Sequence, residues 1–241
     1  MTNIHKTKTG IDLVYTSYMS NNTTDTCVIL LPGIPYNPLK NYDLIDHLTT
    51  QHDVYMIHYD GTWGSSGKFL KHNPVISVQD FISSLERGAF LNTTGSAYKN
   101  VFIIGTSFGG GLALTLKDYP ILKAVCVLSP VISYKSVAGI DTLGEYLKTR
   151  HSDYYTFMSE DMQALITDQI ISPKEQMTLQ TNKLLVFAGE YDDQIPVNDI
   201  LEFCSKNNIA LHTLPMGHIT LSKVNSDIYK KISLFFDKKN A

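Results

Sequence analysis

The chain has 241 residues, of which 43% are hydrophobic and 18% are charged, and its formal net charge is −3. This near balance of charge offers no basic surface for binding nucleic acid through its phosphates, and the apolar stretches are too short to span a bilayer. The N-terminal residues contain no apolar segment of the kind found in secretory signals. Three widely spaced cysteines, Cys27, Cys126 and Cys204, fit reduced buried thiols. We therefore expect a cytoplasmic protein.

The predicted elements alternate between strands and helices along the chain. A hairpin is expected first, with strands at 4–5 and 13–16 on either side of a Lys8-Thr9-Gly10 turn. Six short apolar runs then predict strands buried on both faces of a parallel sheet, at 27–31, 54–59, 101–104, 124–128, 184–188 and 209–214. Helices are predicted between and after them, at 39–50, 78–91, 107–117, 197–206 and 222–236. This alternation predicts a doubly wound α/β fold.

Residues 131–182 break this rhythm because they contain no strand-like run. They do contain helix-like pieces near 140–149 and 159–171. The segment is long for a simple crossover connection. We expect it to form a small helical lid over one edge of a pocket, inserted into a single domain that covers residues 1–241.

Ser107 is the first candidate functional residue. It lies in Gly105-Thr106-Ser107-Phe108-Gly109, directly after a predicted strand and directly before a predicted helix, which is the context of a nucleophile elbow. Glycines on both sides would let the strand and the helix approach closely. The N–H groups at the start of the helix would favour negative charge beside the serine. The alternative is a plain strand-to-helix turn.

A serine hydroxyl needs a base to act as a nucleophile at neutral pH, and His218 is the candidate. It lies in a loop, Pro215-Met216-Gly217-His218-Ile219, between the last predicted strand and the last predicted helix. In doubly wound sheets, ligands bind at the carboxyl ends of the strands, and His218 is placed at such an end. The other histidines fall within predicted strands (His58, His212) or at surface-like positions (His5, His47, His52, His72, His151).

A carboxylate is needed to hold the base in the correct tautomer, and residues 189–196 contain three candidates. Asp192 and Asp193 compete, and Glu190 is a weaker third option. Either aspartate could instead serve as a turn residue or at the start of the next helix, because aspartate favours both positions.

The chain order Ser, Asp, His is that of the α/β-hydrolase superfamily, and three segments resemble its motifs. GTSFGG resembles the nucleophile elbow, GEYDDQIP resembles a G-x-x-D-x-x-V/I-P segment, and MGHI resembles the family's Gly-His segment. The resemblance covers nearly the whole chain and is to serine hydrolases of the esterase and serine aminopeptidase kind. It implies a mostly parallel sheet with an N-terminal hairpin and a small helical lid, and it implies that Asp192 is the aspartate of a catalytic triad.

The resemblance also implies an oxyanion hole made by two backbone N–H groups. One would come from Phe108, and the other from Ile34 in the loop that follows the third predicted strand. The family often has His-Gly at this point, whereas this chain has Pro32-Gly33. The alternative for this loop is an ordinary Pro/Gly turn.

Two aromatic residues are candidates for the substrate pocket. The segment Asp60-Gly61-Thr62-Trp63-Gly64-Ser65 resembles the family's R-G-x-G-x-S loop, with aspartate in place of the usual arginine. Trp63 could form a wall of the pocket or anchor the loop, and Tyr36 could line the pocket or lie at its rim.

The function that these features imply is hydrolysis of a carboxylic ester of a small or medium acyl substrate through an acyl-enzyme. The alternatives are an acyl thioesterase or an aminopeptidase on the same scaffold, and a non-catalytic binding protein, since a fold alone does not establish activity. No cofactor is implied, and no close cluster of histidine, cysteine and carboxylate residues suggests a metal. The partner expected is a small-molecule acyl substrate, and the oligomeric state is left open.

Overall fold

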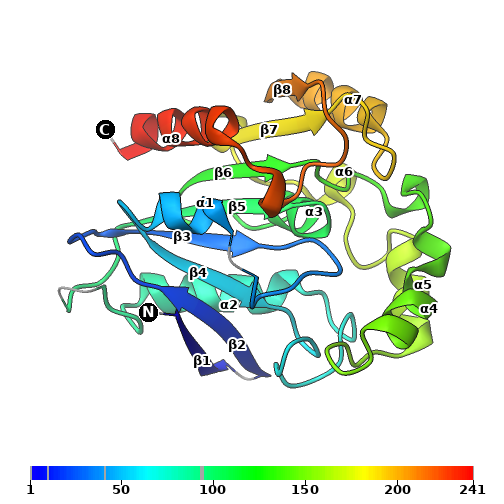
Figure 1. Cartoon of the computed structure of the whole chain (residues 1–241), viewed down its shortest axis with the longest axis horizontal. Coiled ribbons are helices and arrows are strands. Elements are labelled where there is room, and N and C mark those ends of the chain that lie inside the picture. The colour runs from blue at the N-terminus through cyan, green and yellow to red at the C-terminus, as the bar shows by residue number, and fades with distance from the viewer. Residues whose placement is uncertain (1, 10, 41, 93–94, 241) are drawn as a thin grey trace.

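The computed structural model describes residues 2–9, 11–40, 42–92 and 95–240. An eight-stranded sheet forms its centre, in the order β1-β2-β4-β3-β5-β6-β7-β8 (Figure 1). The strands are β1 Thr2–Thr9, β2 Ile11–Tyr18, β3 Thr26–Leu31, β4 Asp53–His58, β5 Asn100–Thr106, β6 Leu122–Leu128, β7 Leu184–Gly189 and β8 Ala210–Leu214.

The pairing of the strands confirms the predicted mostly parallel sheet with an N-terminal hairpin. β1 pairs antiparallel with β2, and β2 pairs antiparallel with β4. The remaining pairs, from β4–β3 to β7–β8, are parallel. Gly10, which belongs to the predicted turn, lies outside the described residues.

Burial of the strands follows their place in the sheet. Every residue of β3, β4 and β7 is buried, as expected for strands covered on both faces. The prediction was wrong for β8, in which every residue is at least partly exposed. β8 is an edge strand with a single neighbour, so one side of its backbone and much of its side-chain surface stay open to water.

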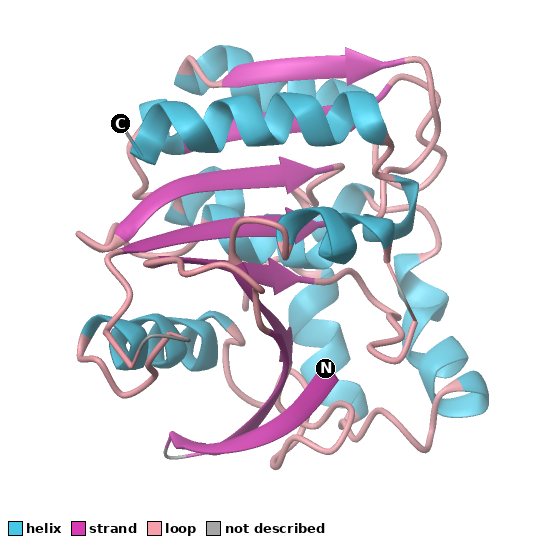
Figure 2. Cartoon of the chain, turned by 60° about the vertical axis from the view of Figure 1, so that its left-hand side comes forward, coloured by secondary structure: helices cyan, strands magenta, loops and turns pink. Residues whose placement is uncertain are grey.

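Helices cover both faces of the sheet (Figures 1 and 2). α1 (Asp43–Leu48) and α8 (Ser226–Asn240) lie on one face, and α2 (Val75–Glu86), α3 (Phe108–Leu114) and α7 (Val197–Asn207) lie on the other. α8 begins four residues later than position 222, where the sequence placed it. The Asn225 side chain explains this start, because its Oδ1 accepts the N–H groups of Asp227 and Ile228 at 3.1 and 3.0 Å and so caps the helix.

Residues 131–182 contain three helices and no strand of the sheet, and all of them are described. The helices are α4 (Ile140–Arg150), α5 (Ser159–Ile166) and α6 (Pro173–Gln176). Figure 1 shows α4 and α5 beyond the carboxyl ends of the parallel strands. Single β-bridges, Thr62 to Tyr155 and Phe69 to Phe157, attach this segment to the loop after β4. Among the described residues, none of the helices is long and apolar enough to cross a membrane.

The junction between β5 and α3 is packed backbone against backbone. A Cβ added at Gly105 would lie 2.5 Å from the carbonyl oxygen of Gly109, and a Cβ added at Gly109 would overlap the carbonyl oxygen of Leu31 at the end of β3. Real Cβ atoms do not make such contacts, so glycine is required for helix α3 to start directly against the ends of β3 and β5.

We predict that Gly109→Ala lowers the free energy of unfolding by about 3 kcal/mol, because overpacking against rigid backbone is costly. The matched control is Gly144→Ala on α4, where an added Cβ makes only ordinary contacts, the nearest at 3.6 Å. Alanine at this helical position should be neutral or stabilising by up to about 1 kcal/mol. Urea denaturation followed by circular dichroism measures both variants, and equal stability of the two would contradict the packing described here.

Candidate active site

Ser107 lies on a sharp turn at the carboxyl end of β5. Its backbone has φ 54° and ψ −117°, a conformation that costs a non-glycine residue about 1–3 kcal/mol. Three backbone hydrogen bonds hold it there. Its N–H donates to Leu128 O at 3.0 Å, and its carbonyl accepts the N–H groups of Gly111 at 2.9 Å and Val131 at 3.1 Å. The turn is therefore fixed by β6, by helix α3 and by the segment after β6.

His218 and Asp192 form a buried pair beside this turn. The Nδ1 atom of His218 is 2.8 Å from Oδ2 of Asp192, and the two side chains are 5% and 1% exposed. Asp193, the competing candidate, is exposed. The structure thus brings Asp192 to His218, in agreement with the alignment of GEYDDQIP.

Hydrogen bonds keep the Asp192 carboxylate ionised in spite of its burial. Burial would raise its pKa, but the hydrogen bond with His218 and the backbone N–H of Ile195 act the other way, as do the charge of His218 and the N–H of Gln194, so the pKa falls below its ordinary value. The N–H groups of Ile195 and Gln194 donate to Oδ1 at 2.9 and 3.0 Å. Asp192 is thus a fixed negative charge next to the imidazole at neutral pH.

The loop that carries His218 is tied to three strand ends. Thr106 Oγ1 donates to the Ile219 carbonyl at 2.8 Å, and the Ile219 N–H donates to Ser129 Oγ at 3.0 Å. Gly189, at the end of β7, lies so close that an added Cβ would overlap the Gly217 carbonyl oxygen. These contacts fix the histidine relative to the ends of β5, β6 and β7.

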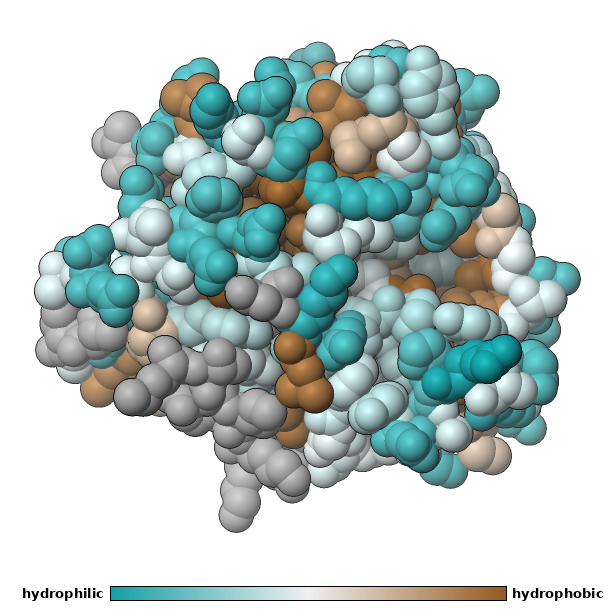
Figure 3. All heavy atoms as spheres, in the orientation of Figure 1, coloured by the Kyte–Doolittle hydropathy of each residue, from teal (hydrophilic) through white to brown (hydrophobic). Residues whose placement is uncertain are grey.

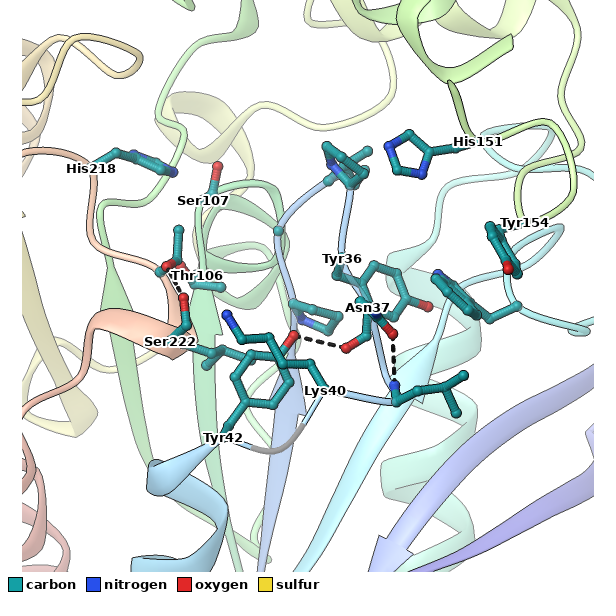
Figure 4. A pocket seen from close by; sticks show the side chains of 18 of the residues that line it. Tyr36, Asn37, Lys40, Tyr42, Thr106, Ser107, His151, Tyr154, His218 and Ser222 are labelled. Atoms are coloured by element: carbon teal, nitrogen blue, oxygen red, sulfur yellow. Dashed lines mark hydrogen bonds between the residues drawn. The ribbon is translucent and has the colours of Figure 1, made fainter. Parts of the chain in front are cut away.

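Ser107 and His218 face one another across a pocket with a volume of about 520 Å³ (Figure 4). Figure 4 shows the His218 ring directed toward the Ser107 hydroxyl. Because Nδ1 of His218 is engaged by Asp192, the other ring nitrogen is the one available to the serine. Figure 3 shows a recess on this face of the molecule, with hydrophobic side chains visible inside it.

The two expected oxyanion donors lie next to Ser107. Phe108 is the first residue of α3, and the first N–H groups of a helix have no partner within the helix. The loop with Ile34 approaches the serine from the end of β3, since a Cβ added at Gly33 would lie 3.7 Å from Ser107 Oγ. Ile34 and Ser107 line the same pocket.

Tyr36 and Trp63 both line this pocket. Tyr36 is buried, its hydroxyl lies 2.9 Å from Thr62 Oγ1, and burial raises its pKa well above the ordinary value. The Trp63 ring stacks on Tyr154 with centroids 4.0 Å apart, so this side chain both lines the pocket and attaches the loop after β4 to residues 131–182. Asp60 does not line this pocket. It is buried and accepts a hydrogen bond from Ser77 Oγ at 2.8 Å.

Sequence reasoning missed several residues of the pocket. His151, assigned to the surface, is half-buried and lines the pocket together with Lys40 and Tyr154. His52 was also assigned wrongly, because it is 8% exposed and its ring lies edge-on to Phe102. The side chain of His5 lies outside what the structure describes. No local pattern marked these positions, since tertiary contacts alone bring them inside. Within the described ranges, no group of three or more His, Cys, Asp or Glu residues is placed to hold a metal ion.

Comparison with solved structures identifies the fold. An esterase of Pyrococcus furiosus superposes with a TM-score of 0.73 at 16% identity, over 100% of this chain and 92% of that one. An E-2-(acetamidomethylene)succinate hydrolase gives 0.69 at 13% identity, over 98% and 100%. N-formylmaleamic acid deformylase of Pseudomonas putida gives 0.68 at 14% identity, over 96% and 100%. No family model matches the sequence, and no curated protein matches it.

The chain therefore has the α/β-hydrolase fold, as its motifs predict. The structures that it resembles have the same arrangement over essentially their whole length. At these identities the likeness establishes the fold and not the substrate.

Proposed function

We propose that this protein is a serine hydrolase that cleaves a carboxylic ester of a small or medium acyl substrate through an acyl-enzyme. The observation that carries the proposal is the position of Ser107, on a strained turn inside a pocket and facing a buried His218–Asp192 pair. The printed names of the similar structures, an esterase, a hydrolase and a deformylase, support a hydrolytic reaction.

In this mechanism Ser107 Oγ attacks the carbonyl carbon of the substrate. His218 takes the hydroxyl proton as the new bond forms and later gives it to the departing alcohol. Asp192 holds the imidazole by its Nδ1 atom and stabilises the imidazolium that forms. Water, activated by the same histidine, then releases the acyl group from Ser107.

The backbone N–H groups of Ile34 and Phe108 would bind the oxyanion of the tetrahedral intermediate. Loss of one such donor typically costs about 2.7–4 kcal/mol of transition-state stabilisation. The start of α3 at Phe108 adds the positive end of a helix dipole next to the developing charge.

Residues 131–182 would act as a lid on a single domain, because this segment supplies Tyr146, His151 and Tyr154 to the pocket above Ser107. A cytoplasmic location is also proposed. Cys27, Cys126 and Cys204 are free and buried, as suits a reducing compartment, and burial raises the pKa of each thiol.

The alternatives receive less support from the pocket. An aminopeptidase needs negative charge to hold a free amino group, and the described residues that line the large pocket include no aspartate or glutamate. A thioesterase would use the same residues and chemistry. A non-catalytic binding protein has no need for the buried His218–Asp192 pair facing Ser107.

We expect Ser107→Ala to abolish hydrolysis in a panel of chromogenic esters, thioesters and aminoacyl amides, with kcat reduced by about 10⁴-fold or more on the best substrate. The parent should be most active on esters. Circular dichroism should show the variant folded, because alanine can occupy the turn as serine does. Parent and variant rates that agree on every substrate would contradict the proposal.

The adjacent aspartates provide a matched pair of variants. Asp192→Asn should reduce kcat by about 10⁴-fold, because an amide at this position no longer favours the required tautomer of the histidine. Asp193→Asn should change kcat by less than about twofold, since this side chain is exposed. Steady-state kinetics on the best ester compares them, and a larger loss at Asp193 would reverse the assignment.

A further inference from the structure

Two chambers of different character meet at Ser107. The larger is the pocket of about 520 Å³ that contains His218. A smaller one of about 100 Å³ lies under α4, and its lining includes Phe108, Val131, Ile140, Leu143 and Leu165. Ile34, Ser107 and Gln194 belong to both linings, so the reacting carbonyl would sit between the chambers.

The position of His218 decides which part of a substrate each chamber holds, a step that rests on the proposed function. The histidine must deliver a proton to the leaving group, so the leaving group has to lie on its side of the carbonyl. His218 lines the larger chamber and not the smaller one. The leaving group therefore occupies the larger chamber, and the acyl chain enters the smaller one.

The smaller chamber limits the acyl chain by its size and its chemistry. A water-sized group takes up about 30 Å³, so the volume of about 100 Å³ holds roughly three methylene-sized groups beyond the carbonyl. Its walls are mainly aliphatic and aromatic side chains from α3, α4, α5 and the segment after β6. A short apolar chain fits this space, whereas a long fatty acyl chain does not.

The larger chamber is positively charged. Lys40 is the only lysine or arginine among its described lining residues, which contain no aspartate or glutamate, and the remaining titratable side chains are histidines and tyrosines. The Lys40 ammonium lies 5.8 Å from the centre of the Tyr42 ring (Figure 4), a cation–π contact that directs the side chain along the chamber wall. Within the described parts of the chain, no carboxylate lies within ion-pair distance of this ammonium.

We infer that the substrate is an ester of a short apolar acid whose leaving group carries a negative charge, and that Lys40 binds this charge. Such a substrate fills both chambers and supplies the counter-charge that Lys40 lacks. Asn37 and Ser222, which line the chamber with Lys40, offer polar groups beside it. A carboxylate and a phosphate share this chemistry.

The charge of the leaving group can be varied with little change elsewhere in the substrate. 4-Carboxyphenyl butanoate and its neutral methyl ester, 4-(methoxycarbonyl)phenyl butanoate, differ only at the far end of the leaving group. Lys40→Gln should raise KM for the anionic substrate about tenfold, the expected effect of losing a bond to a charged group. KM for the neutral substrate and kcat for both should change by less than about twofold.

Lys206→Gln is the matched control. It removes the same charge from an exposed position on α7 outside both chambers, and it should leave the ratio of the two substrates as in the parent. The same ratio of kcat/KM in all three proteins would overturn the role of Lys40. A 4-phosphonooxyphenyl ester, run beside the carboxylate, tells which anion is preferred.

The acyl chain is tested with acetyl, butanoyl and octanoyl esters of one leaving group. The parent should hydrolyse the butanoyl ester at least about tenfold better than the octanoyl ester in kcat/KM. Leu143→Ala, which enlarges the smaller chamber, should reduce this preference, whereas Leu201→Ala on the outside of α7 should not.

An octanoyl ester that the parent cleaves as well as the butanoyl ester would overturn the assignment of the smaller chamber. The proposed function is judged separately, by covalent reaction of Ser107 with a fluorophosphonate. A protein that reacts at Ser107 without these preferences keeps its function and loses this inference.

Discussion

The backbone turn at Ser107 is the constraint on which the rest of the site depends. A residue with φ 54° between a buried strand and a helix is stable only if its neighbours leave room and hold it in place. Gly105 and Gly109 leave that room, and hydrogen bonds to Leu128, Gly111 and Val131 hold the turn. The same packing directs the start of α3 and the serine hydroxyl into one pocket. Strain in the backbone thus places both the nucleophile and the positive end of a helix.

A second constraint is electrostatic and lies in the pairing of His218 with Asp192. Burying a carboxylate is costly unless hydrogen bonds compensate, and here the imidazole and two backbone N–H groups do so. Gly189 and Gly217 let the two loops cross closely enough for this pair to form. The sheet therefore supplies each group from the end of a different strand, and the close crossings of their loops fix the distances between them.

Much of this arrangement could be predicted because it is written in local patterns. The apolar runs located every parallel strand, and Ser107, Asp192 and His218 stand out as polar residues directly after three of them. Helix ends were less accurate, as at α8, where a side-chain cap at Asn225 sets the start. β8 is exposed because of its place at the edge, which no residue within it indicates. Lys40 and His151 reach the pocket through tertiary folding, so periodicity could not reveal them.

The most direct test of the account is the site of reaction with a fluorophosphonate, located by mass spectrometry of the digested protein. The account predicts a single phosphonyl adduct on the peptide that contains Ser107, because only this hydroxyl has a buried His218–Asp192 pair to activate it and adjacent N–H groups to bind the charged oxygen. Ser107→Ala should remain unmodified under the same conditions. Absence of an adduct from the folded parent, or an adduct on a different residue, would contradict the account.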